Sequence, residues 1–167
     1  MLLAEAKKKA AGIVEQLKPH CKEIMVCGSI RRKKPEVRDI DIVMVPSDPW
    51  KLNMEIINLS ADGISKMSGI KIQRIIMKDG VQVDLYFATQ DSWGTLLLIR
   101  TGSAAHNIKL CSRARSMGMH LHADGSGLFK IIHGLSAIPW EQPIATDEAG
   151  IFKALGMSYI EPESREV

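Results

Sequence analysis

Gly28-Ser29-Ile30-Arg31-Arg32 is followed, after a short basic segment, by Asp39-Ile40-Asp41. Residues 37–45 alternate between polar and apolar positions, which predicts a strand. Because side chains alternate along a strand at ~3.3 Å per residue, Asp39 and Asp41 lie on one face with Cα atoms about 6.6 Å apart. Such a pair can bridge two metal ions ~3.5–4 Å apart.

A third acid, Asp84, lies inside the apolar run Val83-Asp84-Leu85. An unpaired carboxylate is unfavourable in an apolar strand, so Asp84 needs a cation or hydrogen-bond donors. If the fold brings it beside Asp39 and Asp41, the like charges repel, and a divalent cation removes that repulsion. Hard oxygen ligands favour magnesium over zinc. We therefore expect these three acids to hold magnesium.

The Gly28-Ser29 step provides what a phosphate chain needs. Glycine lets the backbone approach an anion closely, serine adds a hydroxyl donor, and the N-terminus of a following helix offers N–H groups. Arg32 would neutralise phosphate charge through charge-assisted hydrogen bonds. We expect an anion site next to the metal site.

The rest of the sequence predicts alternating helices and strands. Helices are expected at 2–18, 50–59, 92–100, 103–117 and 146–155, and strands at 23–27, 37–45, 70–77, 81–87, 119–122 and 128–133. Asp79-Gly80 between two apolar runs indicates a hairpin. The break at Gly102 and a change in charge place a domain boundary between residues 1–101 and 102–167.

Composition excludes several classes of protein. The chain has 167 residues, 46% hydrophobic and 25% charged, which is typical of a globular domain and unlike a disordered chain. Its longest aliphatic run is far shorter than the ~20 residues of a membrane helix, and its three cysteines show no zinc or disulfide spacing. We expect a soluble, intracellular monomer with no membrane partner and reduced cysteines.

Charge is distributed unevenly, although the net charge is only +3. No acid occurs between Ser92 and Ala123, where Lys109, Arg113 and Arg115 lie on an expected helix. An ordinary surface mixes both signs, so this helix is a candidate contact for nucleic-acid phosphates. An exposed helix face without a ligand is the alternative. His120, His122 and His133 could indicate zinc, but alternating histidines near a sheet are more often surface residues.

Further motifs follow in order: Thr101-Gly102-Ser103 with His106-Asn107, then Gly127-Leu128-Phe129, Ile151–Gly156 and Tyr159–Glu166. Together with Gly28-Ser29 and the three acids, this series resembles the family X DNA polymerases over residues 5–166. The acids alone are typical of many nucleotidyltransferases, whereas the ordered series is much more specific. The resemblance implies an α+β fold, with a nucleotidyltransferase palm built on a mixed or antiparallel sheet, followed by a small α+β thumb.

The resemblance also implies roles for individual residues. Asp39 and Asp41 match the acids that hold both magnesium ions, and Asp84 matches the acid that joins them at the catalytic metal. Manganese is the expected substitute for magnesium. Gly102-Ser103 matches a step that tends to be a cis peptide beside the incoming sugar, and Asn107 matches an asparagine at the new base pair. The matched nucleotide-binding positions are Gly28, Ser29, Arg32, Thr101, Gly102, Ser103 and Asn107.

Three positions depart from the family pattern. Ile99 and Arg100 replace an aromatic pair that helps to exclude ribonucleotides. Gln82 replaces an arginine two residues before the third acid, so one partner that orients Asp84 is expected to be missing. Cys111 replaces an arginine that contacts the template.

The expected activity is addition of dNMP from dNTP to a primer 3′-hydroxyl, with primer–template or gapped DNA as the partner and short-gap filling in DNA repair as the role. Only 27 residues precede Gly28, so we expect a minimal palm and thumb without a lyase domain. The alternatives are a template-independent terminal transferase, a small nucleotidyltransferase acting on another acceptor, and a non-catalytic DNA-binding module.

Overall fold

The computed structural model describes all residues except 62–63, 70, 133–141 and 167. The chain divides into two compact units, Met1–Thr89 and Gln90–Val167. The division precedes the expected boundary at residues 101/102, because the helix over 93–101 packs into the second unit. None of the described helices is long and apolar enough to cross a membrane.

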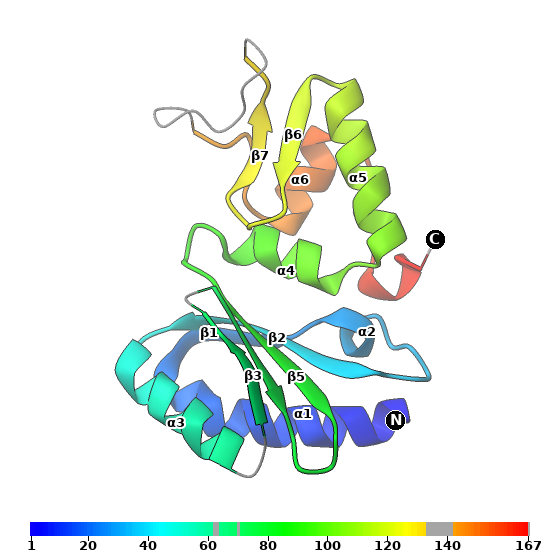
Figure 1. Cartoon of the computed structure of the whole chain (residues 1–167). Helices are drawn as coiled ribbons and strands as arrows, with labels where there is room; N and C mark the ends of the chain where they lie inside the picture. Colours follow the sequence, from blue (N-terminus) through cyan, green and yellow to red (C-terminus); the bar gives the residue numbers. More distant parts are fainter. Residues whose placement is uncertain (62–63, 70, 133–141, 167) are drawn as a thin grey trace. The chain divides into compact units, whose positions relative to one another are not determined.

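The first unit is a five-stranded mixed sheet with helices (Figure 1). Its strands lie in the order β1-β2-β5-β4-β3, and only the β2–β5 pair is parallel. The elements are α1 (Leu3–Leu17), η1 (Lys18–His20), β1 (Cys21–Val26), α2 (Gly28–Arg31), β2 (Asp39–Pro46), α3 (Pro49–Ala61), β3 (Ile64–Ser68), β4 (Ile72–Ile76) and β5 (Gln82–Phe87).

The core of the first unit lies on one face of this sheet, where α1 and α3 cover it (Figure 1). Ala6, Ala10, Ile13 and Leu17 recur at helical spacing along α1 and are buried there. Alternate residues of β2 and β5 complete the core: Ile40, Ile42, Met44, Val83 and Leu85. Because strand side chains alternate, Asp39, Asp41 and Asp84 belong to the opposite face of the sheet.

The second unit has its own core around a two-stranded hairpin. Its elements are α4 (Trp93–Thr101), α5 (Ala104–Ser116), β6 (Met119–His122), β7 (Gly127–Lys130), α6 (Glu148–Ala154) and η2 (Pro162–Ser164). Leu98, Leu110, Leu128 and Phe152 bring α4, α5, β7 and α6 together in this core. Two interiors in one short chain explain why the units form separately compact bodies.

The cysteines are free thiols, as expected for reduced residues. Cys27 is buried, and Cys21 and Cys111 are half-buried. Burial raises the pKa of Cys21 to about 11. This thiol therefore stays protonated, and unreactive as a nucleophile, at neutral pH.

Candidate active site

Two acids meet at the parallel pair of strands in the first unit. The register sets Asp41 of β2 opposite Asp84 of β5, and Asp39 opposite Gln82. Asp84 is 2% exposed, whereas Asp39 and Asp41 are half-buried. The hydroxyl of Tyr86 lies 3.3 Å from Asp41 Oδ1 and 3.4 Å from Asp84 Oδ2, and its proton can serve either carboxylate. The sheet thus brings Asp41 and Asp84 to one place.

Gly28 lies directly against the Asp41 carboxylate. Its φ is +59°, and a Cβ at this position would stand 2.0 Å from Asp41 Oδ2. The chain is held there because the N–H of Cys27 donates to the carbonyl of Asp41 at 2.9 Å. Glycine was expected here for a close approach to an anion, and the anion it approaches in the structure is a carboxylate of the chain itself.

Ser29 and Arg32 line a hollow of about 830 Å³ beside Asp39. The Ser29 hydroxyl is buried and has no hydrogen-bond partner among the described residues. Lys34 and Arg38 line the same hollow, so it combines four side-chain donors, three of them cationic, with two acids, Glu36 and Asp39. A polyanion such as a triphosphate suits this set of donors, because an unpaired buried hydroxyl and several cations favour phosphate oxygens.

Asp84 has a partner that the sequence did not reveal. Arg74, its register partner on β4, donates through Nε to Oδ1 at 2.7 Å and through Nη2 to Oδ2 at 2.6 Å. The amide of Gln82 lies 3.3 Å from both oxygens. The expectation that an orienting partner is missing was wrong, because a neighbouring strand supplies the arginine. The hydrogen bonds with Asp84 also raise the pKa of Arg74.

Asp84, one of the three acids, is already ion-paired with a neighbouring side chain, which bears on how it could bind a metal ion. Among the described residues, no three His, Cys, Asp or Glu side chains form a group that could hold a metal ion. Asp84 is occupied by the guanidinium of Arg74 instead. The chemistry of the donors nevertheless fits magnesium, since they are carboxylate oxygens and one of them adjoins a glycine that leaves it room.

The second unit carries the other predicted nucleotide-binding residues. The Gly102–Ser103 peptide bond is cis, as the resemblance implied, and Thr101 is buried. Ser103 caps α5: its hydroxyl accepts from the N–H of His106 at 3.2 Å. The Asn107 amide group donates to the carbonyl of Ile99 at 2.8 Å, while its oxygen has no partner among the described residues.

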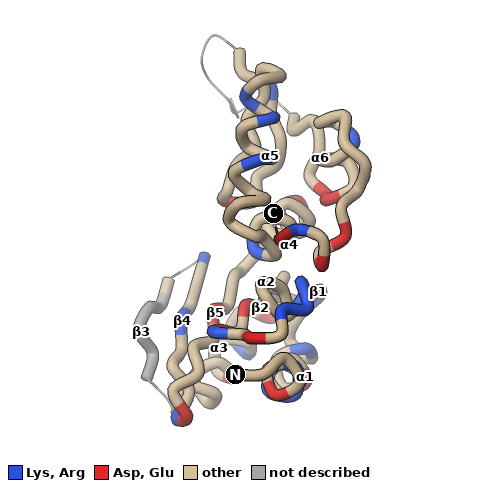
Figure 2. The backbone as a smooth tube through the Cα atoms, turned by 90° about the vertical axis from the view of Figure 1, so that its right-hand side faces the viewer, with Lys and Arg blue, Asp and Glu red and all other residues tan. Residues whose placement is uncertain are grey.

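The three predicted DNA-binding cations all lie on α5, where the tube in Figure 2 shows several basic positions. Lys109, Arg113 and Arg115 are exposed. The Arg113 guanidinium donates to the carbonyl of Leu155 at the end of α6, so this side chain already has a structural contact. Lys109 and Arg115 remain predictions as DNA contacts.

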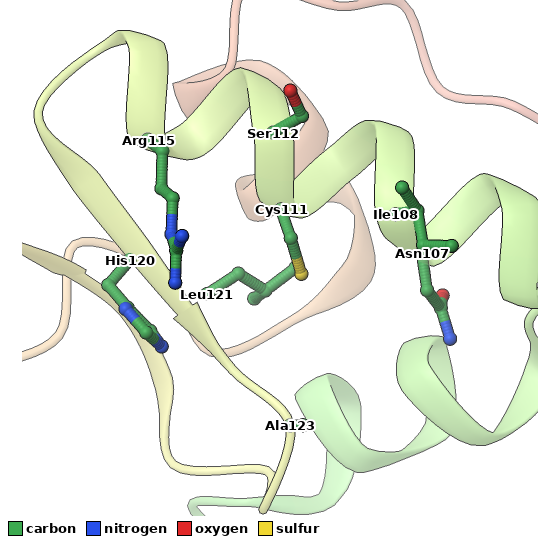
Figure 3. Close-up of a pocket in the computed structure, with 8 residues that line it drawn as sticks. All are labelled: Asn107, Ile108, Cys111, Ser112, Arg115, His120, Leu121 and Ala123. Carbon is green, nitrogen blue, oxygen red and sulfur yellow. The ribbon is translucent and has the colours of Figure 1, made fainter.

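A pocket of about 520 Å³ lies between α5 and β6 (Figure 3). Asn107, Cys111 and Arg115 line it from α5, and His120 lines it from β6. Arg115 stands one helical turn after Cys111, the position expected to have lost an arginine. The pocket therefore retains an arginine, displaced along the same helix.

Sequence reasoning missed Arg74 and Tyr86, and it included Arg165 in the motif Tyr159–Glu166 without assigning it a role. Arg74 interrupts an apolar strand, which was a signal for a paired cation, but its partner depends on the hairpin register. Arg165 is fully buried: it donates to Glu148 Oε1 at 2.8 Å, and its guanidinium lies 5.4 Å from the ring centroids of Phe152 and Tyr159. Its backbone carbonyl accepts from the N–H of Ser103 at 3.2 Å.

Comparisons with known proteins agree with this description. Residues 96–166 match the family model of the DNA polymerase beta thumb. Two crystal structures of Leishmania infantum polymerase beta are similar in fold. The ternary primer–template complex (P/T) matches with 21% identity and a TM-score of 0.81 over all of this chain and 77% of the other. The ternary gap complex matches with 19% identity and a TM-score of 0.83 over all of this chain and 71% of the other.

The first unit is a nucleotidyltransferase-type palm on a mixed sheet, and the second is a small α+β thumb. In fold, the chain resembles the palm and thumb of polymerase beta. Residues 96–166 belong to the DNA polymerase beta thumb family.

Proposed function

We propose that this protein is a DNA-directed DNA polymerase that adds one dNMP at a time from dNTP to a primer 3′-hydroxyl and fills short gaps during DNA repair. The observation that carries the proposal is the pairing of Asp41 with Asp84 across parallel strands, next to an unpartnered buried Ser29 hydroxyl. Carboxylates and a polyanion-binding hollow on one unit are what phosphoryl transfer requires.

Asp39, Asp41 and Asp84 would hold two magnesium ions, or manganese ions in their place. When bound, such ions activate the attacking hydroxyl and neutralise charge on the phosphates. Ser29 and Arg32 would donate to the triphosphate, with Lys34 and Arg38 adding positive charge in the same hollow. Gly28 keeps the space at Asp41 open.

The thumb residues would bind the rest of the substrate. We assign Thr101, Gly102 and Ser103 to the incoming sugar, and Asn107 to the base pair, because its amide oxygen has no partner among the described residues. Lys109 and Arg115 would contact DNA phosphates, with Arg113 as a third, weaker candidate because it is already bonded to α6. A relative of the same fold was crystallised as a gap complex, which supports gapped DNA as the substrate.

The test measures extension of a primer by one nucleotide in a buffer that contains Mg²⁺. A one-nucleotide-gapped duplex is compared with single-stranded DNA, with each of the four deoxynucleotides supplied separately. We expect addition only of the nucleotide complementary to the base opposite the gap. Addition that ignores the template would indicate a terminal transferase, and absence of addition would favour another acceptor or a binding role.

Asp41→Asn is the matched inactive variant. It should lower kcat/KM by at least about 100-fold, because a lost metal ligand removes several kcal/mol of transition-state stabilisation. Asp91→Asn, which neutralises an exposed carboxylate, should retain the wild-type rate. Wild-type turnover by the Asp41 variant would contradict the metal assignment.

A further inference from the structure

The Asp84 carboxylate is already paired with a cation. Arg74 binds it with two nitrogens, one to each oxygen, at 2.7 and 2.6 Å. This is the planar, bidentate geometry in which arginine and carboxylate interact most strongly. Asp84 is 2% exposed, whereas the Arg74 side chain is 33% exposed. The pair therefore joins a buried acid to a partly solvated base.

Other donors occupy the remaining capacity of the same carboxylate. Gln82 Nε2 lies 3.3 Å from both oxygens, and the Tyr86 hydroxyl lies 3.4 Å from Oδ2. A carboxylate has about four lone-pair sites that can accept hydrogen bonds, and these donors occupy most of them. A divalent cation at Asp84 must therefore share or displace contacts that the protein already makes.

The charges on this face explain why the arginine is there. Asp41 and Asp84 are neighbours in the register, and like charges at such a distance repel. Arg74 forms an ion pair with Asp84, with Nη2 2.6 Å from Oδ2. Its positive charge stabilises the site without metal, and the same charge opposes the approach of a divalent ion.

We propose that Arg74 is the counter-ion of the catalytic aspartates in the metal-free protein and the positioning residue of Asp84. Its charge limits metal affinity, and its planar fork fixes the carboxylate for the reaction. The inference rests on the proposed function, because it takes Asp84 as a metal ligand. It assigns a role to a residue on β4, outside the strands that carry the acids.

Two substitutions separate the effect of the positive charge of Arg74 from the effect of its planar, two-nitrogen contact with Asp84. Arg74→Lys keeps the charge but cannot bind both oxygens in a plane, whereas Arg74→Gln loses both. Lys78→Gln is the matched control, because it removes an exposed cation from the same hairpin. Mn²⁺ binding to the full-length protein is measured by electron paramagnetic resonance of the free ion, and steady-state nucleotide addition gives kcat and KM.

We expect Arg74→Gln to bind Mn²⁺ about 10-fold more tightly, because one positive charge near a divalent ion is removed. Arg74→Lys and Lys78→Gln should stay within about 2-fold of wild type, since the first keeps its charge and the second is exposed and screened. Both Arg74 variants should lower kcat about 10-fold at constant KM for dNTP, because the fork touches Asp84 and none of the triphosphate-binding residues.

If Arg74→Gln does not fold, Asp84→Asn is compared with Arg74→Gln/Asp84→Asn, which leaves no unpaired buried carboxylate. The double variant should then bind Mn²⁺ more tightly than Asp84→Asn alone. Unchanged or weaker Mn²⁺ binding on loss of the arginine, in either comparison, overturns the counter-ion role. Wild-type kcat in Arg74→Lys overturns the positioning role.

Failure of the proposed function is recognised separately. If Mn²⁺ binding follows the expected order but no primer is extended, the polymerase assignment fails and the counter-ion role stands. If no variant binds Mn²⁺ at millimolar concentrations, both are overturned.

Discussion

At position 28, both the backbone conformation and a neighbouring side chain favour glycine over any residue with a Cβ. The positive φ of Gly28 is unfavourable for other residues by about 1–2 kcal/mol. The nearby Asp41 oxygen adds a second reason, since a Cβ would lie 2.0 Å from it. Either the backbone or the carboxylate must move when any side chain is added. This residue therefore links the local conformation to Asp41, the acid proposed to bind metal.

Gly28→Ala should destabilise the first unit by about 1–3 kcal/mol and weaken Mn²⁺ binding several-fold, because Asp41 is displaced. Denaturant unfolding and metal titration measure the two effects. Gly12→Ala is the control: Gly12 lies in α1 with nothing within 4 Å of an added Cβ, so this variant should be stabilised by up to ~1 kcal/mol. Equal metal affinity in wild type and Gly28→Ala would contradict the dependence of the Asp41 carboxylate's position on Gly28.

At the scale of elements, the long amphipathic helices and the hairpin between β4 and β5 were predictable. Apolar spacing predicts α1 and α5, and Asp79-Gly80 predicts the turn. The strand β3 was not predicted, because residues 64–68 show no clear apolar pattern among neighbouring glycines and serines. The final expected strand extends to His133, which lies outside the described residues.

The pairing of Arg74 with Asp84 could not be read from the sequence, because it depends on the length of one turn. Met77 donates its N–H to the carbonyl of Val81, so Lys78, Asp79 and Gly80 form a three-residue loop. A two-residue loop would shift the register by one position and set Ile75 opposite Asp84. Such a shift moves every side chain to the other face. The acids of the candidate site were predictable from their spacing, but their counter-ion was not.

The β6–β7 hairpin predicts a pH effect on stability. Burial lowers the pKa of His122, and His120, whose ring centroid lies 4.5 Å away, lowers it further, while Asp124 opposes them. The folded state therefore favours neutral His122, and the unfolded state binds the proton more readily. Stability is fully present above the unfolded value of about 6.5 and is lost as the pH falls below it.

His122→Gln should therefore show a smaller fall in melting temperature between pH 7 and pH 5 than wild type. Thermal unfolding followed by circular dichroism at several pH values measures this difference. His20→Gln, a substitution in the first unit, should keep the wild-type dependence. A fall in the His122 variant as large as that in wild type would contradict the assignment to this histidine.

The whole molecule is stabilised by two separate interiors. In the second, Arg165 is fully buried between Phe152 and Tyr159 and ion-paired with Glu148. Removing one member of a buried ion pair leaves the other without compensation, at a cost of about 3–5 kcal/mol. All four residues of this cluster belong to the second unit, so we expect the stability of the first unit to be independent of it.

Arg165→Met should therefore lower hydrogen-exchange protection of amides in α6 and α5 but not in β2, and Mn²⁺ affinity should be unchanged. Mass spectrometry of exchanged peptides measures both regions in one experiment. The double variant Arg165→Met/Glu148→Met should recover part of the protection, since no buried charge is left unpaired. Equal loss in β2 would show that the two interiors unfold together.

The division after Thr89 has a consequence for protein engineering. The carboxylates, Arg74 and the hollow proposed to bind the triphosphate are encoded before it, and Gly102, Ser103, Asn107 and the basic helix α5 are encoded after it. A hybrid gene joined at this point would exchange the residues assigned to sugar, base and DNA while leaving every acid in place. On the proposed assignment, the residues for substrate preference and the residues for the chemical step thus lie in separate units and can be exchanged independently.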